Sequence, residues 1–357
     1  MIYLNQILKH INNNISLHKK TGIIAASPSY NPDYNYHWIR DSALVMRVFI
    51  DLYSKDKKDE YFRHIINYIE NEYYLQNIKT LSGLGEPKYN IDGSSFDDSW
   101  GRPQNDGPAL RGMMMIKIFN LLKEDYPVIV SQLVSKIIEK DLYYTLNNLN
   151  NPCFDIWEEV YGYHFYTRII QLKFLKDYID NKKVLDEYIV LDNPITDIYT
   201  SFKHNIKDHL TDTSIISSFD YNGNIKRDHD SSIFLAYCHI GFDKEILKDF
   251  NIRYIDYNIK MLLNYFRKKY NDKTILMVGR YPGDKYQDGH IWIICSLALA
   301  QIYRHLGNID NYKKIMSDII KIDDNLDIAE QYNLLEKKQV SSKTLTWNYS
   351  ELYFSLL

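Results

Sequence analysis

Apolar residues along the chain recur mostly at intervals of three and four, which is the spacing of an amphipathic α-helix. Clear stripes of this kind run through residues 44–52, 62–69, 130–138, 169–175 and 255–266. Further helices are predicted over His290–His305 and Leu345–Leu357, and weaker ones near 3–18, 107–123, 184–206, 229–240 and 309–323. The pattern predicts about twelve helices, and few segments alternate with the period of a strand.

The segments between these helices are of two kinds. Some are short and polar, such as 54–59 and 307–311. Others are long and rich in Gly, Pro, Trp and charge, and they cover 22–40, 81–107, 150–164, 277–290 and 325–347. Long loops in a compact domain are usually functional or disordered, and the tryptophans argue against disorder. Because no linker or low-complexity tract interrupts the chain, we expect one domain over residues 1–357, with helical hairpins that place the long loops at one end.

Composition excludes several classes of function. The chain has 357 residues, 45% of them apolar, and a net charge of -3, which gives no basic footprint for nucleic acid or an anionic membrane. No apolar run reaches the ~18 residues of a membrane helix. The segment after Leu8 is too polar for a signal peptide. The three cysteines lack metal-ligand spacing, so we expect no metal and a reducing, cytoplasmic location.

Charged and aromatic residues concentrate in the first two long loops. Arg40 and Asp41 lie where the helix over 44–52 begins, so Asp41 either caps that helix or joins Arg40 in binding vicinal hydroxyls. Tyr34 nearby favours the second interpretation. Trp100 is followed by a glycine and an arginine in a loop, and a sugar face would supply the apolar contact that tryptophan needs.

Three glutamates in the later loops are candidates for acid–base chemistry. Glu158 and Glu159 are adjacent, and either they lie in the first turn of a helix or one serves catalysis and the other binding. Glu330 lies in the last long loop. We hypothesise that Glu158 and Glu330 act on a sugar, one as acid and the other as base.

Seven sequence blocks occur together and in a fixed order. They read SPS…NPDYNYHWIRDSALV, GLGEPKYN, SWGRPQNDGPALR, DIWEEVYGYHFYT, VGRYPGD, AEQY and TLTWNYS. This series resembles the glucoamylases of glycoside hydrolase family 15, the fungal branch above all, from about residue 22 to residue 351. The resemblance implies an all-α fold, the (α/α)6 barrel, with the active site in long loops at one end. It also implies a single catalytic domain without a starch-binding domain.

The resemblance further implies an inverting exo-acting glucan 1,4-α-glucosidase that releases β-D-glucose from the non-reducing ends of starch, glycogen or maltooligosaccharides, as a monomer and without cofactor or metal. Glu158 aligns with the general acid and Glu330 with the general base. The substrate-binding residues that it implies are Tyr34, Arg40, Asp41, Trp100, Glu159, Arg280 and Trp347, and Ser341 aligns with a serine near the base. We expect Glu158 to be protonated, Glu330 to be ionised, and their carboxyls to lie roughly 6.5–9.5 Å apart.

The chain departs from the family pattern in two places. His290-Ile291-Trp292 stands where fungal members have Asn-Pro-Trp, and Gly283 stands where they have an acidic residue. Two alternatives therefore stay open. One is a family-15 enzyme directed to trehalose, isomaltose or dextran. The other is a non-catalytic glucan-binding or regulatory protein, although such a protein would be expected to lose a catalytic glutamate.

Overall fold

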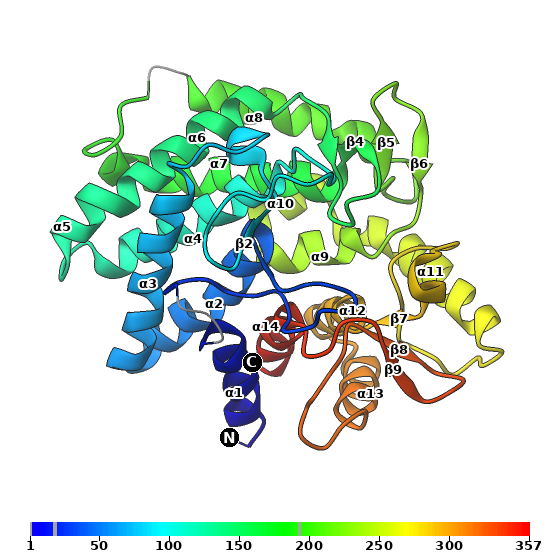
Figure 1. Cartoon of the computed structure of the whole chain (residues 1–357). Coiled ribbons are helices and arrows are strands. Elements are labelled where there is room, and N and C mark those ends of the chain that lie inside the picture. Colours follow the sequence, from blue (N-terminus) through cyan, green and yellow to red (C-terminus); the bar gives the residue numbers. More distant parts are fainter. Residues whose placement is uncertain (1, 17–19, 192–193) are drawn as a thin grey trace. The chain divides into compact units, whose positions relative to one another are not determined.

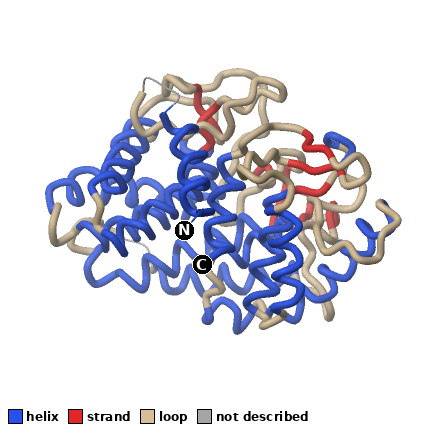
Figure 2. Tube along the Cα trace, turned by 90° about the horizontal axis from the view of Figure 1, so that it is seen from below, coloured by secondary structure: helices blue, strands red, loops and turns tan. Residues whose placement is uncertain are grey.

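The structure is a computed structural model that describes residues 2–16, 20–191 and 194–357. Helices dominate it, and the strands are short (Figure 2). The chain forms two compact units, each built from separated segments. One comprises Ile15–Ala25 and Tyr36–Asp208, and is called here the Glu158 unit; the other comprises Met1–Asn14, Ala26–Asn35 and His209–Leu357, and is called the Glu330 unit. No helix in the described ranges is long and apolar enough to cross a membrane.

The Glu158 unit combines helices that are buried over most of their surface with helices that bury one face. Its main helices are α2 (Ile39–Asp56), α3 (Asp59–Leu75), α4 (Asp106–Leu122), α6 (Ser135–Asn148), α7 (Phe165–Leu185) and α8 (Ile195–Ile206), with a short α5 (Pro127–Ile129) and a π turn (Val130–Val134) before α6 (Figure 1). Helix α4 packs against α2, α6 and α7. A Cβ on Gly112 of α4 would meet the ring of Phe174 at 2.2 Å, so glycine permits the close approach of α4 and α7.

Two short antiparallel strand pairs carry the loops of this unit. Strand β1 (Tyr36–Trp38) pairs with β2 (Lys88–Asn90), and the register sets Trp38 directly opposite Lys88. Strand β3 (Cys153–Phe154) pairs with β4 (Tyr161–His164). Because β1 runs directly into α2, the pairing fixes the direction in which that helix leaves its loop.

The Glu330 unit has α12 at its centre. Its helices are α1 (Ile2–Ser16, the last two residues of which belong to the other unit), α9 (Ser232–His239), α10 (Lys244–Asp249), α11 (Ile255–Lys269), α12 (Ile293–His305), α13 (Ile309–Ile320) and α14 (Thr346–Leu356). Helix α12 is buried along most of its length and packs against α9, α13 and α14. Helix α13 buries a single apolar stripe, as an outer helix does.

Short strands in the Glu330 unit bring its loops together. Strand β5 (Ser218–Asp220) pairs with β6 (Ile225–Arg227), and β7 (Ile291–Trp292), β8 (Gln331–Asn333) and β9 (Lys338–Val340) form a three-stranded antiparallel sheet. In this sheet Gln331 pairs with Val340. Glu330 and Ser341, which flank that pair, therefore lie beside each other.

Most of the predicted helices are present, and the errors lie at their ends. The helix expected from His290 begins at Ile293, because Ile291 and Trp292 form β7. The helix expected over 184–206 is wrong in its first part: α7 ends at Leu185 and α8 begins at Ile195, and residues 192–193 of this span lie outside the described residues. The predicted scarcity of long strands is confirmed in the described ranges.

Candidate active site

Glu158 lies in a tight turn between β3 and β4, with its backbone in the left-handed region at φ 66°. The turn is organised by Asp155, whose carboxylate accepts hydrogen bonds from the backbone N–H groups of Glu159 and Val160 at 2.7 and 2.8 Å. The N–H of Glu158 donates to the carbonyl of Asp155 at 2.9 Å. The interpretation of these glutamates as the first turn of a helix is therefore wrong, and a non-glycine residue at positive φ points to a constrained position.

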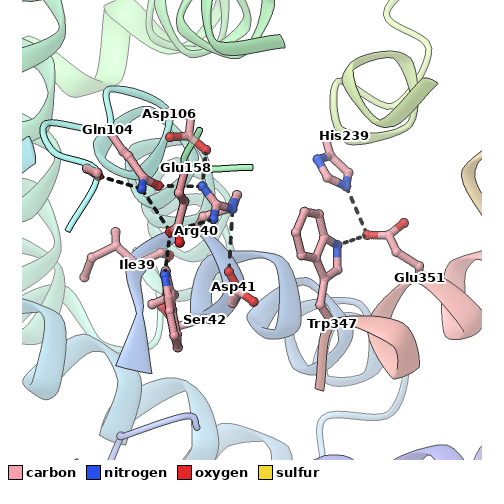
Figure 3. A network of polar contacts seen from close by, with 12 residues as sticks. Ile39, Arg40, Asp41, Ser42, Gln104, Asp106, Glu158, His239, Trp347 and Glu351 are labelled. Atoms are coloured by element: carbon pink, nitrogen blue, oxygen red, sulfur yellow. Dashed lines mark hydrogen bonds and ion pairs between the residues drawn. The ribbon is translucent and has the colours of Figure 1, made fainter. Parts of the chain in front are cut away.

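Donors contact both oxygens of the Glu158 carboxyl, and Figure 3 shows Gln104 and Arg40 beside it. Oε1 accepts from Trp38 Nε1 at 2.8 Å and from Gln104 Nε2 at 2.9 Å, and Oε2 accepts from Trp100 Nε1 at 2.8 Å. Nη2 of Arg40 lies 3.6 Å from Oε1. Hydrogen-bond donors and a cation at these positions stabilise negative charge on a carboxyl group.

Arg40 and Asp41 lie side by side at the start of α2, with Arg40 Nε 3.6 Å from Asp41 Oδ2 (Figure 3). Arg40 Nη1 also donates to Gln104 at 2.8 Å and to Asp106 at 3.1 Å. Burial disfavours the charge of Arg40, yet Asp106, Asp41 and Glu158 together raise its pKa. Burial raises the pKa of Asp41 to about 7, against the opposing charge of Arg40.

The alternative role of Asp41 as a helix cap is only partly met. The N-cap residue of α2 is Trp38, which makes no side-chain cap, and Asp41 lies in the first turn. Its carboxylate there interacts favourably with the helix dipole. Glu159, the other acid beside Glu158, has an exposed side chain.

Glu330 precedes β8 in the other unit and is 2% exposed. Its backbone is held on both sides, because its N–H donates to Ser342 and its carbonyl accepts from Ile293. Its Oε2 accepts a short hydrogen bond of 2.5 Å from the hydroxyl of Ser341. Burial raises the pKa of Glu330 to about 7, and the Ser341 hydroxyl and the charge of Arg280 act in the opposite direction. Burial therefore works against the expected ionisation of Glu330.

Three hydroxyl groups gather near this carboxyl and contact one another. Tyr286 Oη lies 3.3 Å from Ser341 Oγ and 3.0 Å from Tyr34 Oη. Each of the three hydroxyls can both donate and accept, so together they can form a continuous hydrogen-bond network. Tyr34 was predicted from the sequence, whereas Tyr286 was not, and it lies in a segment with no motif that singles it out.

Arg280 is buried and held by a two-point ion pair. Its Nε and Nη2 donate to the two carboxylate oxygens of Asp284 at 2.8 and 2.6 Å. Its guanidinium also lies 4.8 Å from the ring centre of Trp292 and 5.4 Å from that of Tyr286. The glycine between this pair, Gly283, adopts φ +85°, which a side chain would strain.

Trp347 lies in the first turn of α14 and is 4% exposed. Its Nε1 donates to Glu351 Oε1 at 3.0 Å, and the same oxygen contacts His239 Nε2 at 3.0 Å (Figure 3). The second oxygen of Glu351 accepts from Gln301. This buried polar cluster fixes the orientation of the indole.

Sequence reasoning thus identified the carboxyl groups but missed several of their partners. Gln104 and Trp38 lie inside sequence blocks that were recognised, yet nothing in their spacing shows that they meet Glu158. The unit that contains Glu158 brings Arg40, Asp41 and Trp100 close to this carboxyl.

Comparison with known proteins gives these residues a context. The family model for glycosyl hydrolases family 15 matches residues 1–353. The probable glucoamylase of Schizosaccharomyces pombe is 40% identical over 183 residues, which make up 47% of this chain and 40% of that protein. Glucoamylase S1 of Saccharomyces cerevisiae is 36% identical over 171 residues, or 42% of this chain and 22% of that protein. Each alignment spans less than half the length of the relative.

A solved structure agrees over almost the whole chain. The glucoamylase from Saccharomycopsis fibuligera superposes with a TM-score of 0.86 at 23% identity, covering 99% of this chain and 94% of that one. A likeness at this level of identity is evidence of fold. It confirms the predicted fold class, the all-α (α/α)6 barrel.

Proposed function

Because the chain belongs to glycosyl hydrolases family 15, we propose that it is an inverting, exo-acting glucan 1,4-α-glucosidase. It releases β-D-glucose from the non-reducing ends of starch, glycogen or maltooligosaccharides. The observation that carries this proposal is the Glu158 carboxyl, which is held by two indoles and an amide beside the Arg40–Asp41 pair.

In this reaction Glu158 is the general acid and Glu330 the general base. An inverting glycosidase protonates the leaving oxygen with one carboxyl and activates a water molecule with the other. The donors around Glu158 stabilise the carboxylate that proton transfer leaves behind, which suits the role of general acid. The burial that raises the pKa of Glu330 makes that group a strong base once it is ionised.

The binding residues divide by chemistry. Arg40 and Asp41 offer donors and acceptors to the outer hydroxyls of a terminal glucose, and Arg280 offers further donors. Trp100, Tyr34 and Trp347 offer aromatic surface to the sugar faces, and Glu159 offers an exposed carboxylate. A pocket closed behind one glucose would give exo-specificity.

Incubation with maltose and with maltoheptaose, followed by NMR, tests the proposal. We expect β-glucose to appear first from both substrates and then to mutarotate. Early release of shorter oligosaccharides from maltoheptaose would overturn the exo mode, and first appearance of the α-anomer would overturn inversion. Parallel incubations with trehalose, isomaltose and dextran detect a different linkage preference. Binding of maltose without any release of glucose would indicate a non-catalytic protein.

Further properties of the protein follow from the same proposal. The two units together make up one catalytic domain, and the protein acts as a monomer on a glucan. We also propose a reducing compartment, which is favoured by three cysteines that are all buried and not joined by disulfides. Size-exclusion chromatography with light scattering tests the monomer, because a mass near twice 42.5 kDa would contradict it.

A further inference from the structure

Lys88 in β2 is a buried lysine enclosed by four aromatic rings. Its side chain is 1% exposed. Its Nζ lies 3.2 Å from the ring centre of Trp100, 4.1 Å from those of Tyr36 and Phe96, and 4.7 Å from that of Trp38. Burying an ammonium group is costly, and ring faces at these distances offset part of that cost.

The four rings form the walls of a box. Tyr36 meets Trp38 at an interplanar angle of 88° and Phe96 at 76°, and Trp100 meets Phe96 at 86° and Trp38 at 63°. Each ring is therefore tilted steeply against both of its neighbours. The pairing of β1 with β2 sets Lys88 opposite Trp38, and Tyr36 lies two residues away on the same face.

Two walls of this box are also the indoles that hold Glu158. Trp38 Nε1 donates to one carboxylate oxygen and Trp100 Nε1 to the other, both at 2.8 Å. The face of each indole contacts the ammonium group while its N–H contacts the carboxyl group. A cation on the face of an indole draws electron density from the ring, which makes its N–H a stronger donor.

We propose that Lys88 is a positioning residue for the general acid: its ammonium group orients Trp38 and Trp100 and strengthens their hydrogen bonds to Glu158. This inference rests on the proposed function, since it concerns the same carboxyl group. It gives the buried lysine a role in the strength of the acid.

Other charged groups also face Glu158 and set the background. Arg40 from α2 favours the carboxylate, as Lys88 does through the indoles, whereas Asp41 opposes it and Asp106 pairs with Arg40. Removing only the charge of Lys88 therefore leaves the carboxylate less stabilised and makes Glu158 a weaker acid. Since the acid must be protonated to act, the basic limb of the kcat/KM profile moves to higher pH.

Three substitutions at Lys88 test the proposal. Lys88→Met and Lys88→Gln remove the charge, and Lys88→Arg keeps it. For the neutral variants we expect the basic limb to rise by about half a pH unit to one unit, with a loss of kcat on the order of tenfold. Lys88→Arg is expected to leave the limb in place. Neutral variants with an unshifted limb overturn the proposal, and so does an equal shift in all three.

A matched control is available in the same unit. Lys20 Nζ lies 3.2 Å from the ring centre of Tyr74, which is the same distance as that of Lys88 Nζ from Trp100. Unlike Trp100, Tyr74 is not one of the donors to Glu158. Lys20→Met is expected to leave kcat and the pH profile unchanged. If the wild type releases glucose and Lys88→Met behaves as Lys20→Met does, the inference fails while the proposed function stands. If the wild type releases no glucose, the proposed function itself has failed.

The route through the indoles is tested in a Trp100→Phe background. That change keeps an aromatic wall but removes one N–H donor to Glu158. We expect the Lys88→Met shift to be smaller there, because interacting residues give non-additive effects. Additive effects would overturn the indole route. Should both neutral variants fail to fold while Lys88→Arg folds, the charge serves folding rather than catalysis, and the proposal is likewise overturned.

Discussion

The hydroxyl of Ser341 is the contact whose removal gives the sharpest test of the assignment of Glu330. Ser341 donates a 2.5 Å hydrogen bond to the carboxylate of Glu330, which is 2% exposed. This bond lowers the pKa of Glu330 against the effect of burial. Ser341→Ala deletes the donor. The backbone at this position has φ 70°, and alanine tolerates that conformation about as well as serine does.

The size of the effect follows from the strength of such bonds. A hydrogen bond to a charged group contributes about 1.5–3 kcal/mol. A change of about 1.4 kcal/mol between protonation states corresponds to one pKa unit. Without the Ser341 hydroxyl the carboxylate of Glu330 is less stabilised, so the pKa of Glu330 rises. We expect a rise of about one unit, because water replaces part of the lost hydrogen bond. The base acts only when it is ionised, so the acidic limb of the kcat/KM profile moves up by the same amount.

Initial rates on maltose measured across pH provide the assay. Well below the limb, Ser341→Ala is expected to be about tenfold slower than the wild type, and on the plateau the two should differ little. Ser342→Ala is the matched control, because this neighbouring serine is fully buried and its hydroxyl makes no hydrogen bond to any described residue. Its pH profile should equal that of the wild type.

Two outcomes would refute this reasoning. An acidic limb that stays in place would mean that Glu330 does not set it. A limb that moves to lower pH would mean that the hydroxyl stabilises the neutral acid rather than the carboxylate. A lowered melting temperature with an unchanged limb would assign the bond to stability alone.

Three further substitutions extend these predictions. Glu158→Gln is expected to reduce kcat by about 10²–10⁴-fold while maltose still quenches tryptophan fluorescence; turnover at the wild-type rate would contradict its role as acid. Arg111 contacts the buried Asp141 at 2.6 and 2.9 Å, so Arg111→Met leaves that carboxylate without its cation and should lower the free energy of unfolding in urea by about 3–5 kcal/mol. Adding Asp141→Asn should restore part of this loss, and a loss below about 1 kcal/mol in the single variant would contradict the reasoning. Gly112→Ala forces a methyl group against Phe174 and should cost about 1–3 kcal/mol, so an unchanged melting temperature would show that α4 and α7 can separate freely.

Much of the fold could be predicted because helical periodicity is local. The stripe over 44–52 identified α2, and the stripe over 255–266 identified α11, since each helix buries one face or nearly all of its surface. The start of α12 was placed too early because the two residues before it, Ile291 and Trp292, pair with β8, a partner about 40 positions away. The hydrophobic periodicity of a segment cannot reveal a pairing partner that is distant in sequence.

The candidate site was predictable in its residue types but not in its contacts. Glu158, Arg40 and Asp41 stood out by their motifs, and the Glu158 unit brings them together. The ionisation expected of Glu330 did not take account of its burial, and the hydrogen-bond donors around Glu158 were not foreseen. Both effects arise from groups distant in sequence, so no local pattern reports them.

The sequence alone was sufficient for the helical character of the chain, the order of its loops and the family to which it belongs, because these depend on local periodicity and on ordered motifs. Only the tertiary structure decided which groups surround each carboxyl. Trp38 reaches Glu158 across 120 positions of the chain, and Ser341 reaches Glu330 only because β8 pairs with β9. The strength of an acid or a base depends on distances of a few ångströms, and packing sets those distances.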